Sequence, residues 1–489
     1  MNVCVFQASE FSDCTTGIAR FNKLLSLHEG VNTSNGMDTL VVYPQGLVLD
    51  LEIPSGASSI SLTRYTDFNG CTIRVKNTQE ESFVLYKLES QGNGSLIYPY
   101  GLVDSGDFSS YSGLNNGLYL LVIEDMFNWT CRTTNEGTKN VKRRDLLIVR
   151  DGKALNKPIA TYDNLSSLPK GNYYPIDDAP KFFRNLTFER TADSEKKTFL
   201  LEVNKQYNFG IQNLRIATPD ISDVTTANPP QYREDMCVRI MDSACVSLVN
   251  IVVGGSYSGQ GDWGYIFRYE NVWNLYLQNV NGDAPWGITG GFNVSCVLLD
   301  HCEINRFDCH CYGRDFTYRN VTIRTSYFNG RNAYCQISSP YGTMHFQHCK
   351  FIECRPLVLE NSYNAFTGFE LVYEDCEFVV NPTYRFMVDG LCLDTNINPR
   401  TELSVKCLPN IFMRNSTFTI PPSVTNYSLI DFSIQGSSPL YSGTIGHISF
   451  IHMENVSISS SISMNLCGKP IVFPSQLLQQ LLNCNFTLS

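Results

Sequence analysis

A short pattern that recurs along the chain constrains its fold more than any other feature: apolar residues alternate on either side of a central Asn, Asp or His. The ten central residues, called markers below, are Asn185, Asn213, Asn250, Asn279, His301, Asn320, His348, Asp375, Asn415 and Asn455. Strict alternation is typical of short strands that bury one face. Because Asn and Asp tolerate the left-handed backbone of a tight bend, each marker is expected where the chain turns from one strand into the next.

Successive markers lie 19 to 40 residues apart, which predicts one coil of chain for each marker. This spacing is too irregular for propeller blades. It predicts an all-β fold, a right-handed single-stranded parallel β-helix with loops projecting from chosen corners. Stacked coils align equivalent residues, so Cys302, Cys349 and Cys376 are expected as buried thiols in one internal column with Val280 and Val321.

The N-terminal residues predict a cover for the open end of this β-helix. Residues 13–25 have the pattern of a short amphipathic helix, which Ser12 or Asp13 would cap. Its inward-facing residues are expected to be Ile18, Phe21, Leu24 and Leu25. Strand-and-turn elements follow at 40–46 and 67–73. Because an open end exposes unpaired strand groups, a capping α-helix directly before the first coil is expected.

The chain divides into four regions: an N-terminal cap with the helix in 1–37, first coils with an irregular insertion in 38–175, the main β-helix in 176–460, and a C-terminal cap or oligomer contact in 461–489. Residues 101–175 fit the repeat poorly, which indicates a lateral insertion or irregular coils. Within them, the basic run 139–144 is interpreted as a solvated hairpin loop. Residues 475–483 resemble a short amphipathic helix that would cap the far end or seal a subunit interface.

Composition and charge exclude several classes of protein. The chain has 489 residues, of which 43% are hydrophobic and 17% charged, so it is not intrinsically disordered and has enough apolar residues for a large core. A net charge of −10 argues against a nucleic-acid binder and against a basic membrane-surface protein. No apolar run is long enough to span a membrane, and the start lacks the pattern of a signal peptide. The 18 cysteines are therefore expected to be thiols.

The predicted helix and three short motifs carry a resemblance to known proteins. The predicted capping helix, Val42-Tyr43-Pro44-Gln45-Gly46 and Phe68-Asn69-Gly70-Cys71-Thr72-Ile73 resemble the opening of pectate-lyase-like β-helix proteins. The stretch Asn305-Arg306-Phe307-Asp308-Cys309-His310 is similar to a stretch found in phage tailspike and neck-appendage β-helices. The fold resemblance covers roughly residues 13–460.

This resemblance implies a homotrimeric protein of the phage tail that binds, and often cleaves, a bacterial surface polysaccharide. It also implies contacts with other phage tail proteins, and synthesis in the host cytoplasm without a signal peptide. One feature departs from the family pattern. Only about a dozen residues precede the predicted helix, so the N-terminal adaptor domain common in tailspikes is not expected, and the mode of virion attachment stays open.

Candidate catalytic residues are acidic or basic side chains that stacking would bring onto neighbouring coils, which lie about 4.8 Å apart. Asp308 and Asp283 are predicted to act as acid and base or as nucleophile and acid. His310 with Asp308 would alternatively be the base of a lyase that removes a proton next to a uronate carboxylate. Glu353, five residues after its marker, completes the catalytic candidates.

Candidate substrate-binding residues combine aromatic platforms with cations. Aromatic side chains stack on sugar rings, and Arg306 or Arg324 would neutralise a substrate carboxylate. Counting seven residues from each marker aligns Trp286, Asp308, Tyr327 and Arg355 in one column. The predicted platforms are Trp263, Trp286, Tyr327 and Tyr334.

A structural interpretation competes with this one. Residues 306–311 alternate, so Arg306, Asp308 and His310 share one face, where an Arg–Asp pair commonly serves as a structural ion pair. His301 and His348 occupy marker positions and are interpreted as structural turn residues. No metal is expected, because Cys309-x-Cys311 alone is a weak signal, and no cofactor motif occurs.

The sequence therefore predicts a phage tailspike, tail-fibre or appendage protein that recognises a bacterial surface glycan. It leaves open whether that glycan is cleaved, and if so whether by hydrolysis or by elimination. The first alternative is a structural or adhesive virion protein without activity. The second is a free bacterial polysaccharide lyase or glycoside hydrolase, which the missing export signal disfavours.

Overall fold

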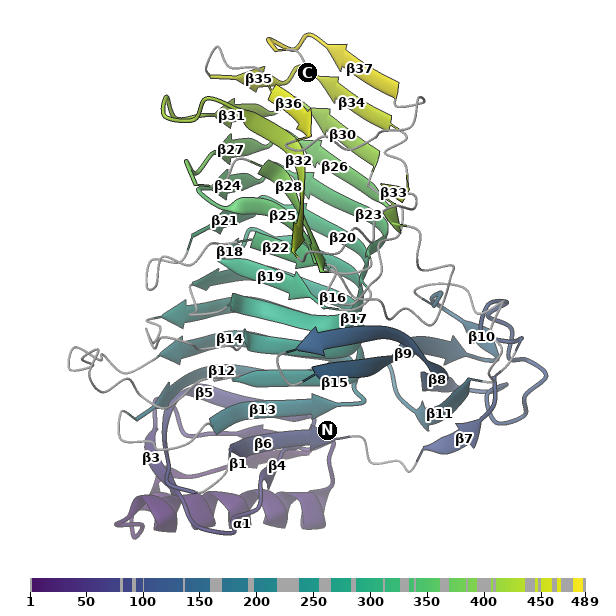
Figure 1. The fold of residues 1–489 in the computed structure, drawn as a ribbon. Coiled ribbons are helices and arrows are strands. Elements are labelled where there is room, and N and C mark those ends of the chain that lie inside the picture. The colour runs from purple at the N-terminus through teal and green to yellow at the C-terminus, as the bar shows by residue number, and fades with distance from the viewer. Residues whose placement is uncertain are drawn as a thin grey trace.

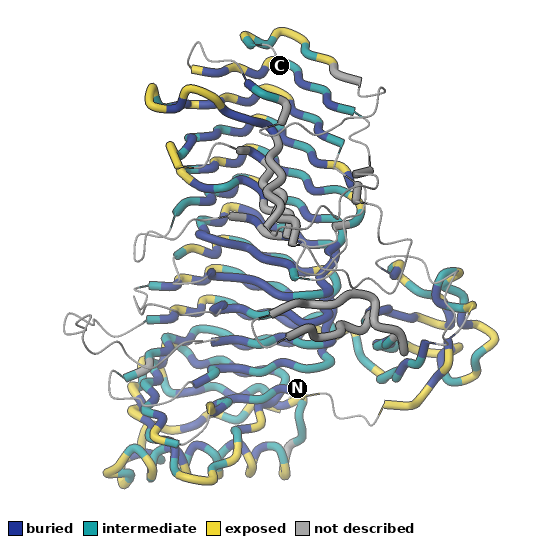
Figure 2. Tube along the Cα trace, in the orientation of Figure 1, coloured by how far each residue is buried: buried dark blue, intermediate teal, exposed yellow. Residues whose placement is uncertain are grey.

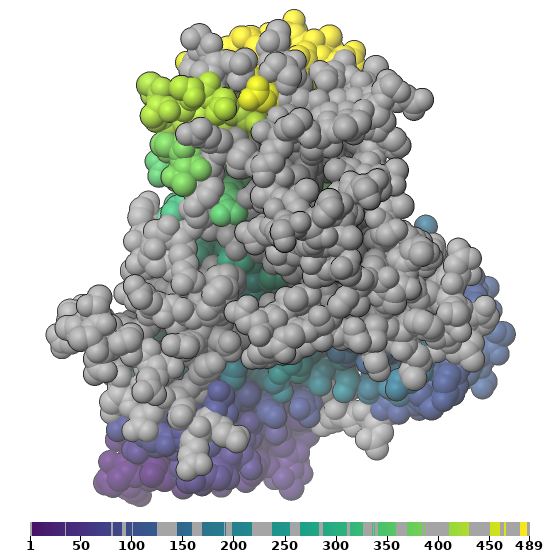
Figure 3. All heavy atoms as spheres, in the orientation of Figure 1, coloured from purple at the N-terminus to yellow at the C-terminus, as the bar shows by residue number. Residues whose placement is uncertain are grey.

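The protein is an elongated stack of strands with a helix at one end (Figure 1). The computed structural model describes residues 2–79, 82–89, 94–99, 101–134, 137–158, 169–191, 198–217, 237–254, 265–282, 287–310, 313–325, 334–337, 340–360, 369–383, 386–393, 406–407, 410–435, 445–446, 450–459, 464–467 and 478–486. In the space-filling view of Figure 3, N-terminal and C-terminal residues lie at opposite ends of this long body.

The predicted right-handed parallel β-helix is confirmed, because the strands of the long sheet pair in parallel with strands one coil further on. Its first strands are β1 (Val3–Val5), β2 (Leu40–Val42), β3 (Val48–Ile53), β4 (Ile60–Ser61), β5 (Tyr65–Asn77) and β6 (Phe83–Glu89). The middle coils consist of β12 (Lys181–Arg190), β13 (Thr198–Asn204), β14 (Tyr207–Ala217), β15 (Val238–Gly254), β16 (Tyr265–Gly282) and β17 (Gly287–Asp300).

Three ladders of strands continue from there to the C-terminal end. The ladder before the markers contains β20 (Gly313–Arg319), β23 (Pro340–Gln347), β26 (Glu370–Glu374), β30 (Asn410–Arg414), β34 (Phe450–Glu454) and β37 (Leu478–Leu482). The ladder after the markers contains β18 (Glu303–Ile304), β21 (Thr322–Arg324), β24 (Lys350–Ile352), β27 (Glu377–Val379), β31 (Thr417–Thr419) and β35 (Ser457–Ile458). The third contains β19 (Arg306–Cys309), β22 (Tyr334–Ile337), β25 (Arg355–Glu360), β28 (Phe386–Leu393), β32 (Tyr427–Gln435) and β36 (Met464–Cys467).

The markers occupy the predicted bends. All ten have a positive φ, between 50° and 64°, which is the left-handed region that Asn and Asp tolerate. Their side-chain amides form a ladder: Asn213 donates to Asn185, and Asn250 donates to Asn213 at 3.1 Å. Asn483 has the same backbone conformation and donates to Asn455, so the C-terminal coil carries a further marker.

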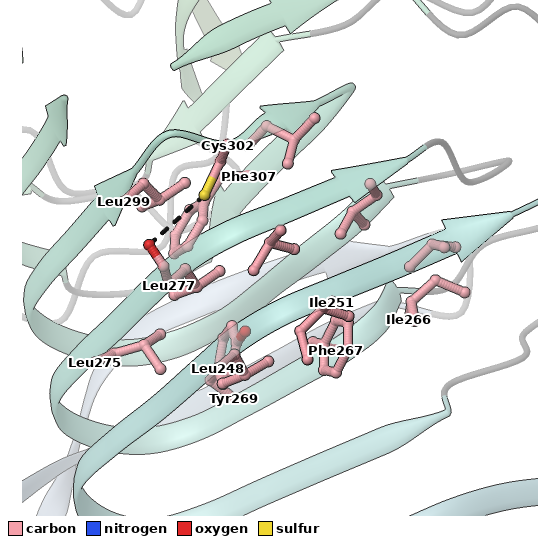
Figure 4. Packing of buried hydrophobic residues seen from close by; sticks show 14 of the residues in the cluster. Leu248, Ile251, Ile266, Phe267, Tyr269, Leu275, Leu277, Leu299, Cys302 and Phe307 are labelled. Carbon is pink, nitrogen blue, oxygen red and sulfur yellow. Dashed lines mark hydrogen bonds between the residues drawn. The ribbon is translucent and has the colours of Figure 1, made fainter. Parts of the chain in front are cut away.

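The core fills the inside of the coils along the whole stack (Figure 2). Leu248, Leu275, Leu277 and Leu299 lie on the inside of the coils in Figure 4, where Cys302 Sγ donates to the Leu277 carbonyl. The predicted internal column is confirmed, since its members are all at most 2% exposed: Val280, Cys302, Val321, Cys349 and Cys376. Aromatic rings also stack from coil to coil in this core. These pairs include Tyr318 with Phe346, Phe346 with Tyr373, and Phe378 with Phe418.

A helix covers the N-terminal end, as predicted, but it is longer and begins later than expected. Helix α1 (Gly17–Asn35) is capped by the Thr16 hydroxyl, which accepts from the Ala19 amide, and not by Ser12 or Asp13. Phe21 and Leu24 are fully buried as predicted, whereas Ile18 is 38% exposed. A 3-10 turn, η1 (Ala8–Phe11), precedes the helix. Among the described residues, no helix is long and apolar enough to cross a membrane.

The prediction of a helix at 475–483 is wrong. Residues Leu478–Leu482 form strand β37, which pairs in parallel with β34. The pattern of leucines fits one face of a helix, but β34 offers a row of unpaired backbone groups. Pairing with this row satisfies those groups and extends the β-helix by one coil.

A separate antiparallel sheet projects from the side of the β-helix (Figure 1). Its strands, in spatial order, are β10 (Lys153–Ala154), β9 (Gly137–Arg150), β8 (Leu118–Thr134), β11 (Lys170–Pro175) and β7 (Ser95–Ile97). The basic run 139–144 lies within β9 and is not a loop, contrary to the sequence interpretation. Strands β29 (Lys406–Cys407) and β33 (Ile445–Gly446) form a third, two-stranded parallel sheet. The region boundaries drawn from the sequence stay a prediction.

An apolar cluster and an ion pair help to attach the lateral sheet to the β-helix. Leu120, Leu146 and Ile148 pack with Ala244 of β15. Beside them, Arg144 donates two hydrogen bonds to the Asp242 carboxylate, at 3.0 and 2.9 Å. Charge and burial therefore act together to fix this sheet on the coil that carries β15.

Candidate functional site

Strand β19 places three polar side chains on its outer face. Phe307 and Cys309 point into the core and are at most 1% exposed. Burial raises the pKa of the Cys309 thiol to about 12. Because side chains alternate along a strand, Arg306, Asp308 and the following His310 lie on the opposite face. The sequence predicted that these three residues share one face, and strand β19 places them so.

Tyr265, the first residue of β16, joins Asp308 to His310. Its hydroxyl donates to Asp308 Oδ2 at 2.5 Å and lies 2.8 Å from His310 Nε2. Arg306 forms an ion pair with the same Oδ2 atom, and His310 Nε2 is 3.8 Å from it. A guanidinium, a phenol and an imidazole thus surround one carboxylate oxygen. These four residues are called the Tyr265 cluster below.

Two glycines of β17 make room for the Tyr265 cluster. A Cβ atom on Gly290 would lie 2.5 Å from the Tyr265 ring, and one on Gly287 would lie 3.0 Å from the Arg306 side chain. Gly290 pairs in register with Asp308, so the position next to Asp308 on the preceding coil has no side chain. The Tyr265 ring occupies that space.

Exposure rises from one end of the cluster to the other. The Asp308 side chain is fully buried and the Arg306 side chain is 4% exposed, whereas the His310 side chain is 17% exposed. A buried carboxylate held by a guanidinium and a phenol cannot approach a bound molecule. The imidazole is the member nearest to solvent, and an imidazole at a surface can accept or donate a proton.

Other predicted residues have structural partners of their own. Arg324 forms an ion pair with Glu303 on the preceding coil of the ladder after the markers. Glu353 is exposed and has a φ of 50°, so it occupies a bend. Its amide donates to the Val379 carbonyl and its own carbonyl accepts from the Thr325 hydroxyl. Glu353 therefore has a turn role besides its predicted catalytic one.

The column counted seven residues from the markers is not formed. Asp308 pairs in register with Gln336, whereas Arg355 pairs with Tyr334 and Tyr334 pairs with Arg306. The register shifts between Tyr334 and Gln336, so equal distances from the markers no longer give equal positions in this ladder. Counting residues from the markers predicts which residues pair directly after each bend, but it no longer does so further along the coil.

Several predicted residues lie outside what the structure describes. Asp283, Trp263, Trp286 and Tyr327 belong to segments between the described ranges, and for Tyr334 only the place on β22 is described. Their roles stay predictions. Within the described residues, no group of three His, Cys, Asp or Glu side chains could hold a metal ion.

Sequence reasoning missed Tyr265. It lies 14 residues before its marker Asn279, outside the short pattern that revealed the coils. A signal was present in the next coil, where Gly287-Ile288-Thr289-Gly290-Gly291 is unusually poor in side chains for the start of a strand. Glycine within a strand often marks the close approach of another group, which here is the Tyr265 ring.

Two solved structures share this architecture along nearly the whole chain. The Gp54 tailspike of Acinetobacter baumannii bacteriophage AP22, in complex with A. baumannii capsular saccharide, aligns with a TM-score of 0.54 at 11% identity, over 96% of this chain and 80% of that chain. The tailspike protein gp49 from Pseudomonas phage LKA1 aligns with a TM-score of 0.55 at 14% identity, over 94% of this chain and 74% of that chain. The chain has the β-helix fold of these tailspikes. No protein-family model matches the sequence, and no curated protein does.

Proposed function

We propose that the protein is a tailspike-type component of a phage tail that binds a bacterial surface polysaccharide. The observation that carries this proposal is the shared fold with two phage tailspikes, one of them solved with a capsular saccharide. The fold suits the role physically. A rigid stack of coils presents an extended surface, along which a repeating polymer has many equivalent places to bind.

The residues proposed to contact sugar are the aromatic platforms Trp263, Trp286, Tyr327 and Tyr334, together with Arg324. Aromatic rings stack on the apolar faces of sugar rings, and polar groups fix the orientation of the hydroxyls. Arg306 is excluded from direct contact with an acidic sugar in this proposal, because it is buried and paired with Asp308. Asp283 and Glu353 are kept as candidates for polar contacts.

The proposed assembly is a homotrimer attached to other phage tail proteins. Light scattering of the purified protein tests the trimer directly. A monomer that cleaves a polysaccharide would favour a free bacterial enzyme, and an oligomer that binds no glycan would favour a structural virion protein.

The decisive experiment measures binding of the full-length protein to a panel of purified bacterial capsular polysaccharides and lipopolysaccharides. We expect saturable binding to at least one of them, and a weaker affinity in Tyr327→Ala. The matched control is Tyr98→Ala, which removes a 64% exposed tyrosine of the lateral region and is expected to bind as the unaltered protein does. Failure to bind any glycan from a broad panel of hosts would overturn the proposal.

A further inference from the structure

We propose that the outer face of the ladder before the markers is the contact surface between copies of this chain, packed side by side with their long axes parallel. This inference rests on the proposed homotrimer and names the surface that would form it. The centre of that surface is a column of outward-pointing, uncharged residues, called the apolar stripe below. It runs from β1 at one end of the stack to β37 at the other (Figure 1).

The apolar stripe contains the residue three positions before each marker, together with its register partners in the first coils. Strand pairing joins these fourteen residues in one unbroken row from Val3 to Gln480. Side chains alternate along each strand, and the next residues on either side belong to the buried core, so the stripe faces outward. Its large apolar members include Leu40, Phe182, Tyr276, Leu298, Val372 and Phe412.

The composition of the stripe is unusual for an outward-facing row. None of its fourteen residues is Asp, Glu, Lys or Arg. A sheet face in contact with water ordinarily carries polar and charged side chains. Single exposed apolar residues are common, but contiguous ones mark contact surfaces. Val3 is 61% exposed, and Leu40, Leu298 and Phe412 are half-buried, so the stripe presents apolar atoms along its length.

The column beside the stripe, one residue before each marker, is charged instead. Seven of its fourteen residues are Asp, Glu or Arg, and six of these pair with one another: Arg184 with Asp67, Arg319 with Asp300, and Arg414 with Glu374. These charges are therefore balanced within one chain and require no counter-charge from a partner. An apolar centre bordered by a polar rim is the usual arrangement of a protein–protein interface.

The length of the stripe determines what can cover it. Fourteen paired strands at a spacing of about 4.8 Å span roughly 60 Å. A bound peptide or a small domain would cover only part of this length. Another copy of the same stack, aligned in parallel, has the same length and the same order of coils. Each coil then meets its equivalent, so that apolar members of the stripe face apolar members.

The two columns also supply enough residues for a stable interface. An interface of standard size involves about 20 to 30 residues on each side. The stripe and the charged column contain fourteen residues each. The terminal strands offer much less, because β1 has three residues and β37 has five. Side-by-side packing is therefore favoured over association through the ends of the stack.

The test measures the mass of the full-length protein by light scattering and its length by small-angle X-ray scattering. The unaltered protein is expected at three times 55.1 kDa, with the length of one stack. Val372→Glu places a charge in the stripe of every copy, so that like charges face one another. We expect the concentration needed for assembly to rise at least about a hundredfold, which leaves the single chain of 55.1 kDa.

Further variants separate the contact from charge and from folding. Leu298→Glu repeats the test three coils away from Val372 and is expected to give a single chain as well. Val252→Glu adds the same charge to a 46% exposed valine on the ladder after the markers and should remain a trimer. Val372→Thr keeps the shape of valine without a charge and should also assemble. Thermal unfolding of each variant shows whether the coils are intact.

The outcomes distinguish this inference from the proposed function. Trimers of Val372→Glu and Leu298→Glu as stable as the unaltered one overturn the inference and leave the proposed trimer standing. Dissociation of Val252→Glu to the same extent, or a trimer longer than one stack, also overturns it, because the contact would then lie elsewhere. A monomeric unaltered protein overturns both the inference and the proposed trimer. Polysaccharide binding is measured separately, so none of these results decides the proposed glycan-binding function.

Discussion

Each marker asparagine combines two properties that an aliphatic residue lacks. Its backbone adopts a left-handed bend at low cost, and its amide can both donate to and accept from an equivalent amide on a neighbouring coil, as that of Asn250 does with Asn213 and Asn279. Where histidine replaces asparagine, the bend remains but the ladder does not continue through it. His301 instead contacts Asp300 at 2.8 Å, and the His348 ring lies 3.7 Å from Asp375.

Asn250 allows these two contributions to be measured separately. Asn250→Ala should lower the free energy of unfolding by about 2 kcal/mol, because alanine is strained at a φ of 57° and the two amide hydrogen bonds are lost. Asn250→Gly loses the hydrogen bonds without the backbone strain, so it should cost about half as much. Urea denaturation of both variants checks this. Equal losses would show that the left-handed bend contributes nothing.

His28 makes stability depend on pH. Its side chain is fully buried at the interface of α1 with the first coils, where Nε2 lies 2.7 Å from the Tyr43 hydroxyl. Burial lowers its pKa to about 3, from an ordinary value of 6.5. The unfolded chain therefore takes up a proton below pH 6.5 while the folded protein does not. Stability is fully present above that pH and should fall by about 1.4 kcal/mol per pH unit between 6.5 and 3.

His28→Gln tests this assignment, because glutamine is polar and does not titrate. Its stability at pH 7 is expected to be lower than that of the unaltered protein, since the fit in the core is imperfect. Between pH 6.5 and 3, however, its free energy of unfolding should fall less steeply than that of the unaltered protein. Parallel pH profiles for the two proteins would show that His28 does not cause the dependence.

At the scale of whole elements, the sequence predicted the strands of the coils better than it predicted the structure at the two ends of the β-helix. The alternating pattern identified ten marker bends and missed the one at Asn483, because alternation and a left-handed residue are both local properties. The ends of the stack are decided by tertiary contacts. Leu478 and Leu481 fit a helix or a strand equally well, and the free edge of β34 selects the strand. Likewise the helix begins at Gly17, where a Cβ atom would lie 2.8 Å from Glu52 of β3.

The lateral sheet is an element whose attachment can be loosened without opening the coils. Asp242 accepts from Arg144 of β9 and from Asn271 of β16, and its own φ is 43°. Asp242→Asn keeps the tolerance for this backbone but removes the negative charge. We expect amide hydrogen exchange in β8 and β9 to become about tenfold faster while exchange in β16 changes little. Equal acceleration in both regions would mean that the lateral sheet and the coils open as one unit.

At the scale of the whole molecule, the Tyr265 cluster shows why a site is harder to predict than a fold. Asp308 and His310 were found because they are close in sequence and alternate on one strand. Tyr265 comes from β16, two coils away, and reaches Asp308 because Gly290 on the coil between has no side chain. That contact depends on the register of three coils at once. The register in turn depends on loop lengths and bulges, which marker spacing does not specify.

The reactivity of the cysteine thiols depends on how tightly the coils are packed along the whole stack. Thirteen cysteines have described side chains, eight of them buried and five half-buried. The buried ones run along the core, and burial raises the pKa of Cys302 to about 11 and that of Cys309 to about 12. A thiol reacts as its thiolate, so both burial and the raised pKa protect these residues at neutral pH.

Alkylation of the folded protein at pH 7, followed by mass spectrometry, should therefore modify the half-buried Cys14 and Cys245 while Cys302 and Cys309 stay unmodified. All four should react once the chain is unfolded in denaturant. Rapid modification of Cys302 in the folded protein would contradict the packed internal column, and with it the stacking that brings Tyr265 within reach of Asp308.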